Sequence, residues 1–438
     1  MSNIRTFTSY TPHKNQLKYH QSTARERIII SSIRAGKTFG LIHDIIVKAW
    51  NIEPHEANMI PLPVILVCAP TYSQVRDLLF DPIKALATRT GLYKRSSSML
   101  SGMQIELLNG RIIVFRTLGA NSAETIRGIT AAHAYVDECA LCTQSAINTV
   151  RGRLMTTQGS LSLSTTPKGK SNWLYQDYFS STAKVPVGTE IFHYNIYDNP
   201  VITIEAVEHL KSIYPPKLYE QEVEGKFVSL DTSSIYYEFD YDRNVSNDTT
   251  FPQNFPIWVG VDYNLDKNPA IFGYKRKDGV VVIFDEIYGC KTTKDLAIEI
   301  LRRYPNATRM ELTIIDDAKS GTARSQIDGS TNRQLLNQMG FKRIISARSN
   351  PPRTERYDNM NAHFRNAKGN ARLIINPKCK NLIKDLMELE FKPNSDKPET
   401  LNEQLGHASD ALGYLLNYIS PWAGREGHFQ RTQNIRIG

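Results

Sequence analysis

Two hydrophobic patterns follow one another along the chain, and the first occupies its N-terminal half. Short runs of β-branched residues there alternate with a helical pattern at 38–50, whose apolar side chains fall on one face. Buried strands that alternate with amphipathic helices predict a parallel sheet with crossover helices, which is an α/β arrangement. The buried strands that we expect are 27–31, 64–70, 132–138 and 160–166, with a hairpin around Asn109-Gly110, a dipeptide that suits a tight turn.

The second pattern begins at residue 257 and is mixed α/β. A hairpin is expected around Asp278-Gly279, followed by a helix, the strand ELTIIDDA and a helix at 405–415. Between the two patterns lie a helical segment and polar residues, which are typical of a connector. We therefore divide the chain into a first domain at 1–200, a connector at 201–250, a second domain at 251–420 and a flexible basic tail at 421–438.

Composition narrows the class of protein. The chain has 438 residues, which suits two domains, and its 41% hydrophobic content is sufficient for buried cores. The net charge of +9 favours a polyanionic partner about as strongly as it favours a merely basic soluble protein. The five scattered cysteines predict neither a disulfide framework nor a zinc site. No signal-peptide core or membrane-length apolar run is seen, so we expect a cytosolic protein without membrane contact.

The segment SSIRAGKT at 31–38 lies between the first predicted strand and the amphipathic helix, which is the setting of a phosphate-binding loop. Its backbone N–H groups and the helix N-terminus are expected to surround the phosphates of a nucleotide. Lys37 would neutralise the β and γ phosphates, and the Thr38 hydroxyl would hold Mg²⁺. The alternative is a surface turn that happens to contain Gly-Lys-Thr, but the flanking elements favour the nucleotide site.

Two adjacent acids end the predicted strand at 132–138. Since α/β sheets bind ligands at the carboxyl ends of their strands, Asp137 is expected to coordinate Mg²⁺ through water and Glu138 to activate the water that attacks the γ phosphate. A pair of helix-capping acids is the alternative interpretation. The next strand ends in Thr165 and Thr166, whose hydroxyls are candidates for sensing a phosphate.

Three acids in the second half predict a metal-dependent nuclease. Asp262 stands in an otherwise apolar strand, where an unpaired carboxylate would cost several kcal/mol. Asp316 follows an apolar run, and Asp410 lies in a helical pattern. Taken singly, each acid is explained as a strand-end or capping residue. Together they are expected to hold a pair of Mg²⁺ or Mn²⁺ ions that clamp a phosphodiester.

Some neighbours of these acids are further candidates. Asp317 and Glu286 are possible auxiliary ligands. His407 lies one helical turn before Asp410 and is expected on the same face, either tuning the site or, as we prefer, packed as an ordinary histidine.

In order and spacing, these segments resemble the large terminase family of tailed bacteriophages over nearly the whole chain. The resemblance implies a fold that joins a RecA-like P-loop ATPase domain to an RNase H-like nuclease domain. The landmarks are TPHKNQ, SSIRAGKT, IRG ahead of VDE, STTP, YDNP with QEVEGKF, VGVDY, IIDDA and HASDALGY.

The resemblance also implies roles for particular residues. Gln16 would contact adenine, and Arg34 belongs to a variant phosphate loop that also contains Ala35 and Gly36. Arg127 matches an arginine that reaches into the active site of a neighbouring subunit, a role suited to its planar, permanently charged donor group. Arg151 and Arg153 are rivals for that role. The chain departs from the family at Ser31, where glycine is usual, and at Ile33, where many relatives have an arginine.

By the same resemblance, the expected function is a viral DNA packaging motor. ATP hydrolysis would drive double-stranded DNA through the portal into the procapsid, and the nuclease would cut concatemeric DNA. The expected partners are DNA, the portal protein, the small terminase subunit and further copies of the chain, monomeric in solution and forming a ring of five on the procapsid. The host cytoplasm is the expected location, with transient attachment to the procapsid and none to the mature virion. The rivals are a helicase or repair ATPase with a nuclease domain, and a structural DNA-binding protein with a degenerate ATP fold.

Overall fold

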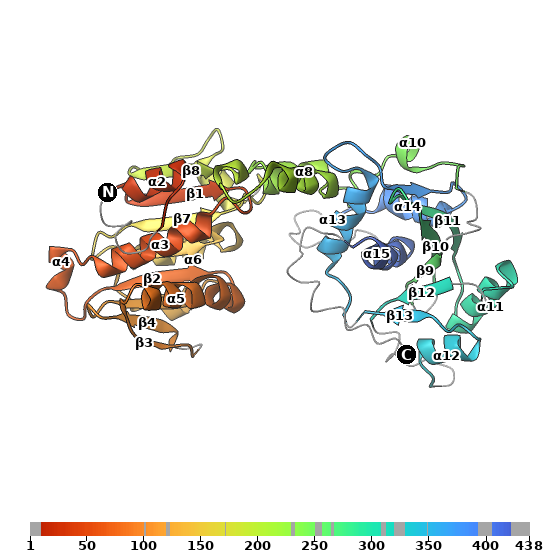
Figure 1. Ribbon diagram of the computed structural model, residues 1–438, viewed down its shortest axis with the longest axis horizontal. Helices are drawn as coiled ribbons and strands as arrows, with labels where there is room; N and C mark the ends of the chain where they lie inside the picture. The colour runs from red at the N-terminus through yellow and green to blue at the C-terminus, as the bar shows by residue number, and fades with distance from the viewer. Residues whose placement is uncertain are drawn as a thin grey trace. The chain divides into compact units, whose positions relative to one another are not determined.

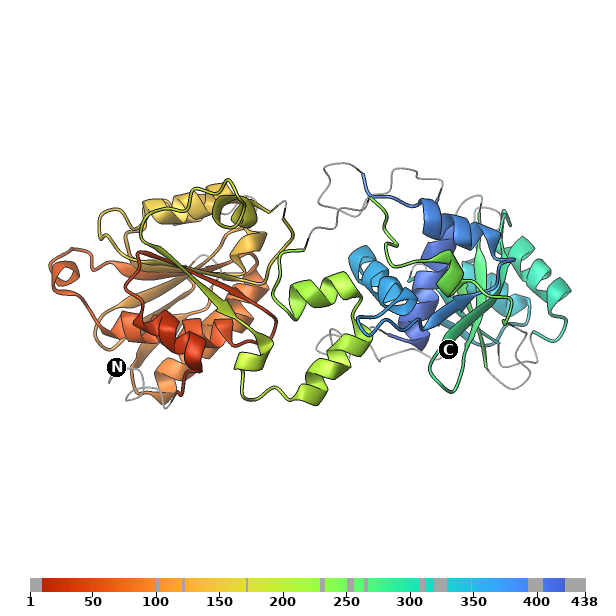
Figure 2. The ribbon, with the colours of Figure 1, turned by 90° about the horizontal axis from the view of Figure 1, so that it is seen from above.

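A computed structural model of the chain contains two compact units (Figures 1 and 2). The first comprises Met1–Val207 and Glu220–Ser229, and the second Glu208–Tyr219 and Leu230–Gly438. None of the described helices is long and apolar enough to cross a membrane. Residues 422–438, most of the expected basic tail, lie outside the described residues. The described residues are 10–99, 102–119, 123–170, 172–228, 233–249, 256–263, 267–307, 312–318, 329–347, 349–392 and 405–421.

The first unit is built on an eight-stranded sheet with the order β3-β4-β5-β2-β6-β7-β1-β8. In this order, the strands β5, β2, β6, β7, β1 and β8 run parallel to one another, and β3 and β4 add an antiparallel edge. The strands are β1 (Glu26–Ser31), β2 (Val64–Ala69), β3 (Tyr93–Ser97), β4 (Gln104–Leu107), β5 (Ile112–Thr117), β6 (Ala131–Asp137), β7 (Leu161–Thr165) and β8 (Thr189–Tyr194).

Helices cover both faces of this sheet, as Figure 2 shows. In β1, Ile29 packs in the cluster that contains Leu41 and Ile45 of α3, whereas Ile28 packs in the cluster of Ile147 from α6. Alternate side chains thus bury on opposite faces, which explains why every residue of β1 is buried and why Ile28, Ile29 and Ile30 follow one another directly. The helices of this unit are α2 (Lys14–Gln21), α3 (Lys37–Trp50), α4 (Pro54–Ala57), η1 (Gln74–Phe80), α5 (Asp81–Arg89), η3 (Ala123–Ile126), η4 (Cys139–Leu141), α6 (Gln144–Gly152), α7 (Trp173–Tyr178) and η5 (Ile196–Asp198). Helices α8 (Ile204–Ile213) and α9 (Pro216–Glu222) each contain residues of both units.

The second unit has a six-stranded mixed sheet with the order β13-β12-β9-β10-β11-β14. Its strands are β9 (Ile257–Val261), β10 (Ala270–Lys275), β11 (Val281–Ile287), β12 (Leu312–Asp316), β13 (Ile344–Ser346) and β14 (Leu373–Ile375). Its helices are α10 (Tyr241–Asn244), α11 (Thr293–Arg303), α12 (Asn332–Gln338), α13 (Arg353–Phe364), α14 (Lys380–Glu388) and α15 (His407–Ile419). In Figure 1, α15 and α11 lie on opposite faces of this sheet.

Helix α15 lies unusually close to the sheet. A Cβ atom on Gly260 of β9 would meet the carbonyl oxygen of Ala411 at 2.2 Å and the Cβ of Leu415 at 2.9 Å. Real Cβ atoms do not approach other atoms so closely. Glycine at position 260 is therefore what allows α15 to sit directly on β9.

The predicted strands and hairpins are found where the hydrophobic pattern placed them. Gly110 and Gly279, at the two predicted turns, have φ angles of +87° and +86°, values that glycine adopts without strain. The strands β3 and β8 were not predicted, because the sequence YKRSS of β3 is almost entirely polar and TEIFHY of β8 does not alternate apolar and polar residues regularly.

Candidate functional site

The predicted phosphate loop connects β1 to α3. Arg34 and Gly36 have positive φ angles of 57° and 85°, so the backbone turns sharply before α3 begins at Lys37. Helix α3 has 14 residues, and its first N–H groups have no intrahelical acceptor, as required of an anion-binding helix N-terminus. Gly36 also lies against Gln16, whose amide would have to shift if position 36 had a side chain, since a Cβ there would lie 2.8 Å from Nε2 of Gln16.

Side chains from distant parts of the first unit hold this loop. Nε2 of Gln16 donates to the carbonyl oxygen of Gly36 at 2.9 Å, and its Oε1 accepts from the N–H of His13 at 3.0 Å. The Asn199 amide donates to the carbonyl oxygen of Arg34 at 2.6 Å. Nε2 of His13 lies 3.1 Å from the carbonyl oxygen of Ala35. Gln16 thus braces the loop, and its contact with adenine stays a prediction.

The Mg²⁺ ligands expected from the sequence are brought together. The Thr38 hydroxyl donates to Oδ2 of Asp137 at 2.8 Å, and the Ser164 hydroxyl donates to Oδ1 at 2.5 Å. Burial raises the pKa of Asp137, and Lys37 and these hydroxyls oppose that effect. A carboxylate and a hydroxyl are oxygen donors that suit Mg²⁺, so this pair fits the ion in kind. Ser31, at the end of β1, is buried and donates its hydroxyl to the carbonyl oxygen of Ser32.

Lys37 and Glu138 form an ion pair at the same strand ends. Nζ of Lys37 lies 2.9 Å from Oε1 of Glu138 and 3.3 Å from the Thr166 hydroxyl. Burial lowers the pKa of Lys37, but Glu138 and Asp137 outweigh it, so the net pKa is raised. Glu138 has a φ angle of 52°, an uncommon conformation for a residue with a side chain. Its Oε2 accepts from Thr165 at 3.4 Å, so the acid contacts the strand that follows.

The three candidate trans-acting arginines have different surroundings. Arg127 is exposed just after η3. Arg151 is bound within its own unit, with Nε and Nη2 at 3.2 and 2.9 Å from the two carboxylate oxygens of Glu26. Arg153 is the C-cap residue of α6. The ion pair of Arg151 gives that residue a structural function inside the unit, which leaves Arg127 as the more accessible candidate.

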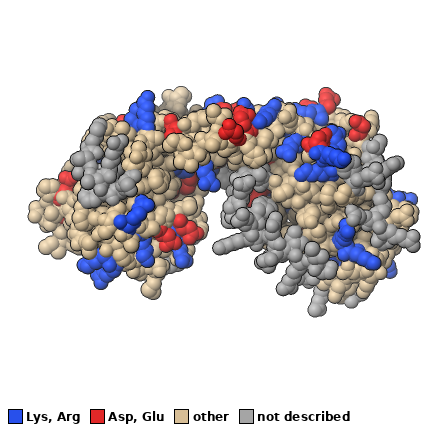
Figure 3. Space-filling model, in the orientation of Figure 1, with Lys and Arg blue, Asp and Glu red and all other residues tan. Residues whose placement is uncertain are grey.

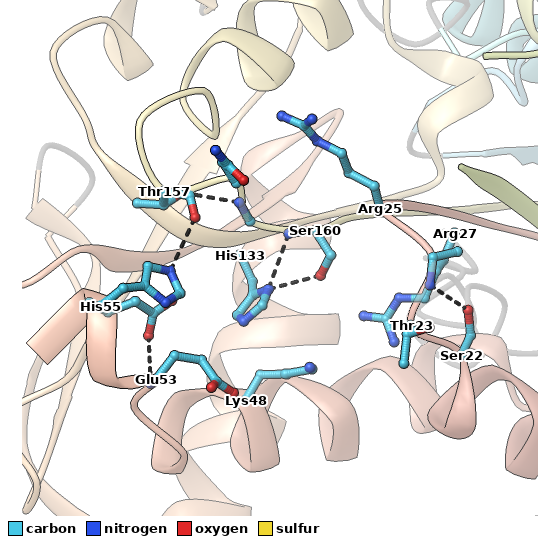
Figure 4. A pocket seen from close by; sticks show the side chains of 14 residues that line it. Ser22, Thr23, Arg25, Arg27, Lys48, Glu53, His55, His133, Thr157 and Ser160 are labelled. Atoms are coloured by element: carbon cyan, nitrogen blue, oxygen red, sulfur yellow. Dashed lines mark hydrogen bonds between the residues drawn. The ribbon is translucent and has the colours of Figure 1, made fainter. Parts of the chain in front are cut away.

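A cavity of about 310 Å³ lies at the opposite ends of these strands (Figure 4). It is lined by side chains at the starts of β1, β6 and β7 and at the end of α3, including Arg25, Lys48, Glu53, His133 and Ser160. Burial lowers the pKa of His133 to about 4, so the ring is neutral and pairs with Ser160 at 2.8 Å. Lys37 and Asp137 do not line this cavity, which is therefore distinct from the phosphate loop.

In the second unit, the three predicted nuclease acids come from adjoining elements. Asp316 ends β12 and pairs with Val261 of the neighbouring parallel strand β9, so Asp262, the next residue, lies at the same edge of the sheet. Asp410 is in the first turn of α15, the helix packed on β9. Burial raises the pKa of Asp410, Arg356 opposes this effect, and the charge of Asp262 adds to it. Asp262 and Asp410 are thus close enough to repel.

Each of these acids contacts a protein group. Nη1 of Arg356 donates to Oδ1 of Asp410 at 2.7 Å, and Nδ1 of His407 lies 3.2 Å from Oδ2 of Asp262. This hydrogen bond to Asp262 is the main cause that raises the pKa of His407. The Ser346 hydroxyl donates to Asp316.

Carboxylate oxygens are the donors that Mg²⁺ and Mn²⁺ prefer, so the three acids fit such ions in kind. Among the described residues, however, no three acidic, imidazole or thiol side chains are gathered closely enough to hold an ion as they stand. Binding requires these side chains to move toward one another, and the predicted ligand set Asp262, Asp316 and Asp410 stays a prediction.

Other acids near this edge support the helices. The Glu286 carboxylate accepts N–H groups of Asn381 and Leu382, at the start of α14, which accounts for its burial without a metal ion. Asp385 accepts the N–H groups of Ala408 and Ser409 at 3.0 and 3.1 Å and so fixes the start of α15. Asp385 and Arg356 are not among the residues predicted from the sequence. An acid among the apolar positions of an amphipathic helix was the available signal for Asp385, whereas nothing in the sequence marks Arg356.

Two comparisons of the sequence with known proteins point to one family. The sequence model of the family described as "Terminase large subunit, T4likevirus-type, N-terminal" matches residues 28–243. The PBSX phage terminase large subunit of Bacillus subtilis (strain 168) is 22% identical over 382 residues, covering 80% of this chain and 83% of that protein.

Solved structures give the same result for the fold. A large terminase from a thermophilic bacteriophage has a TM-score of 0.64 and 21% identity, covering 93% of this chain and 99% of that one. The same phage protein in complex with ADP has a TM-score of 0.63 and 20% identity, with the same coverage.

Fold and site together define the class: an α/β unit with a phosphate loop, followed by a second, mixed α/β unit, the fold also found in the large terminase of the thermophilic phage. The expected fold class is therefore confirmed. Within this class, the chain belongs to the terminase large subunit family.

Proposed function

We propose that this protein is an ATP-driven DNA packaging motor with its own endonuclease. The observation that carries the proposal is the assembly of Lys37, Thr38, Asp137 and Glu138 at adjoining strand ends, on the phosphate-loop side of the sheet. In the roles proposed for them, Lys37 neutralises phosphate charge, Thr38 and Asp137 hold Mg²⁺, and Glu138 activates water, which are the parts that phosphoryl transfer from ATP to water uses.

The ion pair between Lys37 and Glu138 sets the order of events. When a nucleotide enters, the γ phosphate draws the Lys37 ammonium away, since phosphate carries more charge than a single carboxylate. Glu138 then loses its cation and is free to accept a proton from the attacking water. A Mg²⁺ ion held by Thr38 and Asp137 would neutralise charge on the phosphates. A neighbouring subunit's copy of Arg127 would stabilise the transition state.

Strand β7, which follows the acids Asp137 and Glu138, is placed to respond when Lys37 and Glu138 separate. Thr165 contacts Glu138, and Thr166 contacts Lys37, so both groups that respond to the phosphate touch the end of β7. We infer that a shift of either side chain moves the segment Thr165–Pro167, and that this movement is coupled to DNA translocation.

The nuclease function is proposed for the second unit. Asp262, Asp316 and Asp410 would bind Mg²⁺ or Mn²⁺ after rearrangement and direct the ions to a phosphodiester. The acids lie at one edge of a mixed sheet, as expected of residues that act together.

The proposed partners follow from family membership. They are double-stranded DNA, the portal protein, the small terminase subunit and other copies of this chain in a ring on the procapsid. The proposed location is the host cytoplasm, with transient attachment to the procapsid and absence from the mature virion.

On the face shown in Figure 3, lysines and arginines of each unit are interspersed with acids. We therefore expect phosphate contacts distributed over the surface, and binding that weakens steeply with salt.

The deciding experiment is packaging in vitro with purified procapsids, scored as DNA protected from added nuclease. Wild-type protein should protect DNA with ATP but not with a non-hydrolysable analogue, and Lys37→Ala should abolish both protection and ATP turnover. Lys48→Ala, at the other end of α3, is the matched control and should retain both. Protection that survives Lys37→Ala contradicts the proposal, and ATP-dependent unwinding of a forked duplex would favour a helicase instead.

A further inference from the structure

The contact between Arg356 and Asp410 is the most informative one in the second unit. Arg356 lies on α13, and its Nη1 donates to Oδ1 of Asp410 at 2.7 Å. The arginine is 4% exposed, so its charge has almost no water to stabilise it. A buried guanidinium persists only beside a partner of opposite charge, and Asp410 is that partner.

Packing holds the Arg356 side chain along one face of α15. Its guanidinium lies over the Tyr414 ring, 4.7 Å from the centroid, and Tyr414 is one helical turn after Asp410. Between them is Gly413, where an added Cβ would meet Cδ of Arg356 at 3.4 Å. The arginine stem thus passes close to the backbone of α15 at Gly413, and the stacked ring restricts its movement.

The contact uses one oxygen of the carboxylate. Within the part of the chain that the structure describes, the hydrogen bond of Arg356 goes to Oδ1 of Asp410, and no bond to Oδ2 is found. An arginine that merely neutralised the acid would be expected to bind both oxygens with its fork. One-sided binding leaves the second oxygen available while the first fixes the direction of the carboxylate.

We propose that Arg356 is a positioning residue that anchors Asp410 as the fixed ligand around which the nuclease metal site closes. This inference rests on the proposed nuclease function. Asp262 and Asp316 are bound by His407 and Ser346, groups that a metal ion displaces more easily than a packed guanidinium. Asp410 therefore stays in place, and the other two acids move to meet the ion. Arg356 also offsets the repulsion between Asp410 and Asp262 before any ion arrives.

The test is a titration of the full-length protein with Mn²⁺, in which free Mn²⁺ is followed by electron paramagnetic resonance. The binding that is lost in Asp262→Asn defines the nuclease-site ions. Arg356→Gln should weaken this binding at least about tenfold, as removal of groups that orient metal ligands usually does. Arg356→Lys, which keeps the charge but loses the planar fork, should weaken it less. ATP turnover should be unchanged in both.

Arg365→Gln is the matched control. Arg365 directly follows α13 and pairs with Glu238 at 2.7 Å, the same length as the pair of Arg356, and this pair is separate from the three nuclease acids. Its Mn²⁺ binding should equal that of the wild type. Near-ultraviolet circular dichroism checks folding, and if Arg356→Gln fails to fold, Arg356→Lys decides the question by the same titration.

The outcomes separate the two proposals. Unchanged Mn²⁺ binding in a folded Arg356 variant overturns the positioning role, and tighter binding overturns it in favour of an arginine that competes with the metal. If Asp262→Asn binds Mn²⁺ as the wild type does, or if the wild type binds none, the proposed metal site itself is lost. That result is independent of the Arg356 variants.

Discussion

Nζ of Lys37 lies 2.9 Å from Oε1 of Glu138 in the first unit. The residue proposed to hold phosphate is thus paired with the residue proposed to activate water. While the pair is intact, the ammonium and the carboxylate neutralise each other, so the pair must separate before the lysine holds phosphate and the glutamate takes a proton from water. This arrangement couples the chemical step to nucleotide entry, and it gives the first prediction.

Glu138→Gln should separate nucleotide binding from hydrolysis. The amide cannot accept a proton as a carboxylate does, so ATP turnover should fall by on the order of 100-fold or more. Nucleotide affinity should be retained or increased, since Lys37 no longer has to leave an ion pair. Steady-state turnover and equilibrium binding of ATP measure the two effects.

The control for this variant is Glu106→Gln, which removes the ion pairs of β4 Glu106 with Lys94 and Arg95, both at 2.6 Å. Glu106→Gln should leave ATP turnover and ATP affinity unchanged. Loss of nucleotide binding in Glu138→Gln would show that the acid holds the loop together instead of acting on water.

Gly36→Ala should abolish nucleotide binding. The position has a φ angle of +85°, and the new Cβ would lie 2.8 Å from Nε2 of Gln16, the side chain that braces the loop. Gly110→Ala is a matched comparison, with a φ angle of +87° and nothing within 4 Å of the added Cβ. It should cost only the backbone strain, about 1–2 kcal/mol by urea unfolding, and keep ATP binding. Equal binding defects in the two variants would contradict the proposed bracing by Gln16.

Asp410→Ala should destabilise the protein more than Asp262→Ala does. Removing Asp410 leaves the buried Arg356 charge without its partner, a change that typically costs about 3–5 kcal/mol. Asp262 pairs with the half-exposed His407, which can release its proton when the partner is gone. Urea unfolding of the full chain compares the two. Plasmid cleavage should be lost in both, so Asp262→Ala is the better variant for separating cutting from folding. Equal stability of the two would mean that Arg356 finds another partner.

His363 should make the protein acid-labile. It is buried between the carbonyl oxygen of Asn359 and the Ser420 hydroxyl, and burial lowers its pKa to about 4. The unfolded histidine, with an ordinary pKa near 6.5, takes up a proton first as the pH falls. Stability is therefore complete above about pH 6.5 and declines toward pH 4, by about 2 kcal/mol at pH 5.

Urea unfolding at about pH 7 and about pH 5 measures this effect. His363→Gln should lose less stability than the wild type between these two values, whereas the exposed His209→Gln should behave like the wild type. A wild-type decline that is unchanged in His363→Gln would assign the lability to other groups.

The sequence was sufficient to predict the parts of the site that depend on order along the chain. The phosphate loop and the acids at strand ends were predictable because a buried strand restricts where a charged side chain can emerge, as Asp137 and Asp262 show. The supporting contacts were not predictable, since they join residues distant in sequence. Gln16 bracing Gly36, Asn199 holding Arg34, and Arg356 anchoring Asp410 each follow from packing in three dimensions, and no local pattern marks them.

The lack of a side chain at Gly260 determines how close the Asp410 carboxylate lies to the sheet. Because α15 rests directly on β9 at this residue, any side chain there would lift the helix and carry Asp410 away from Asp262. A single added methyl group, two residues before Asp262, would thus disrupt the proposed nuclease site while leaving all three of its acids in the sequence.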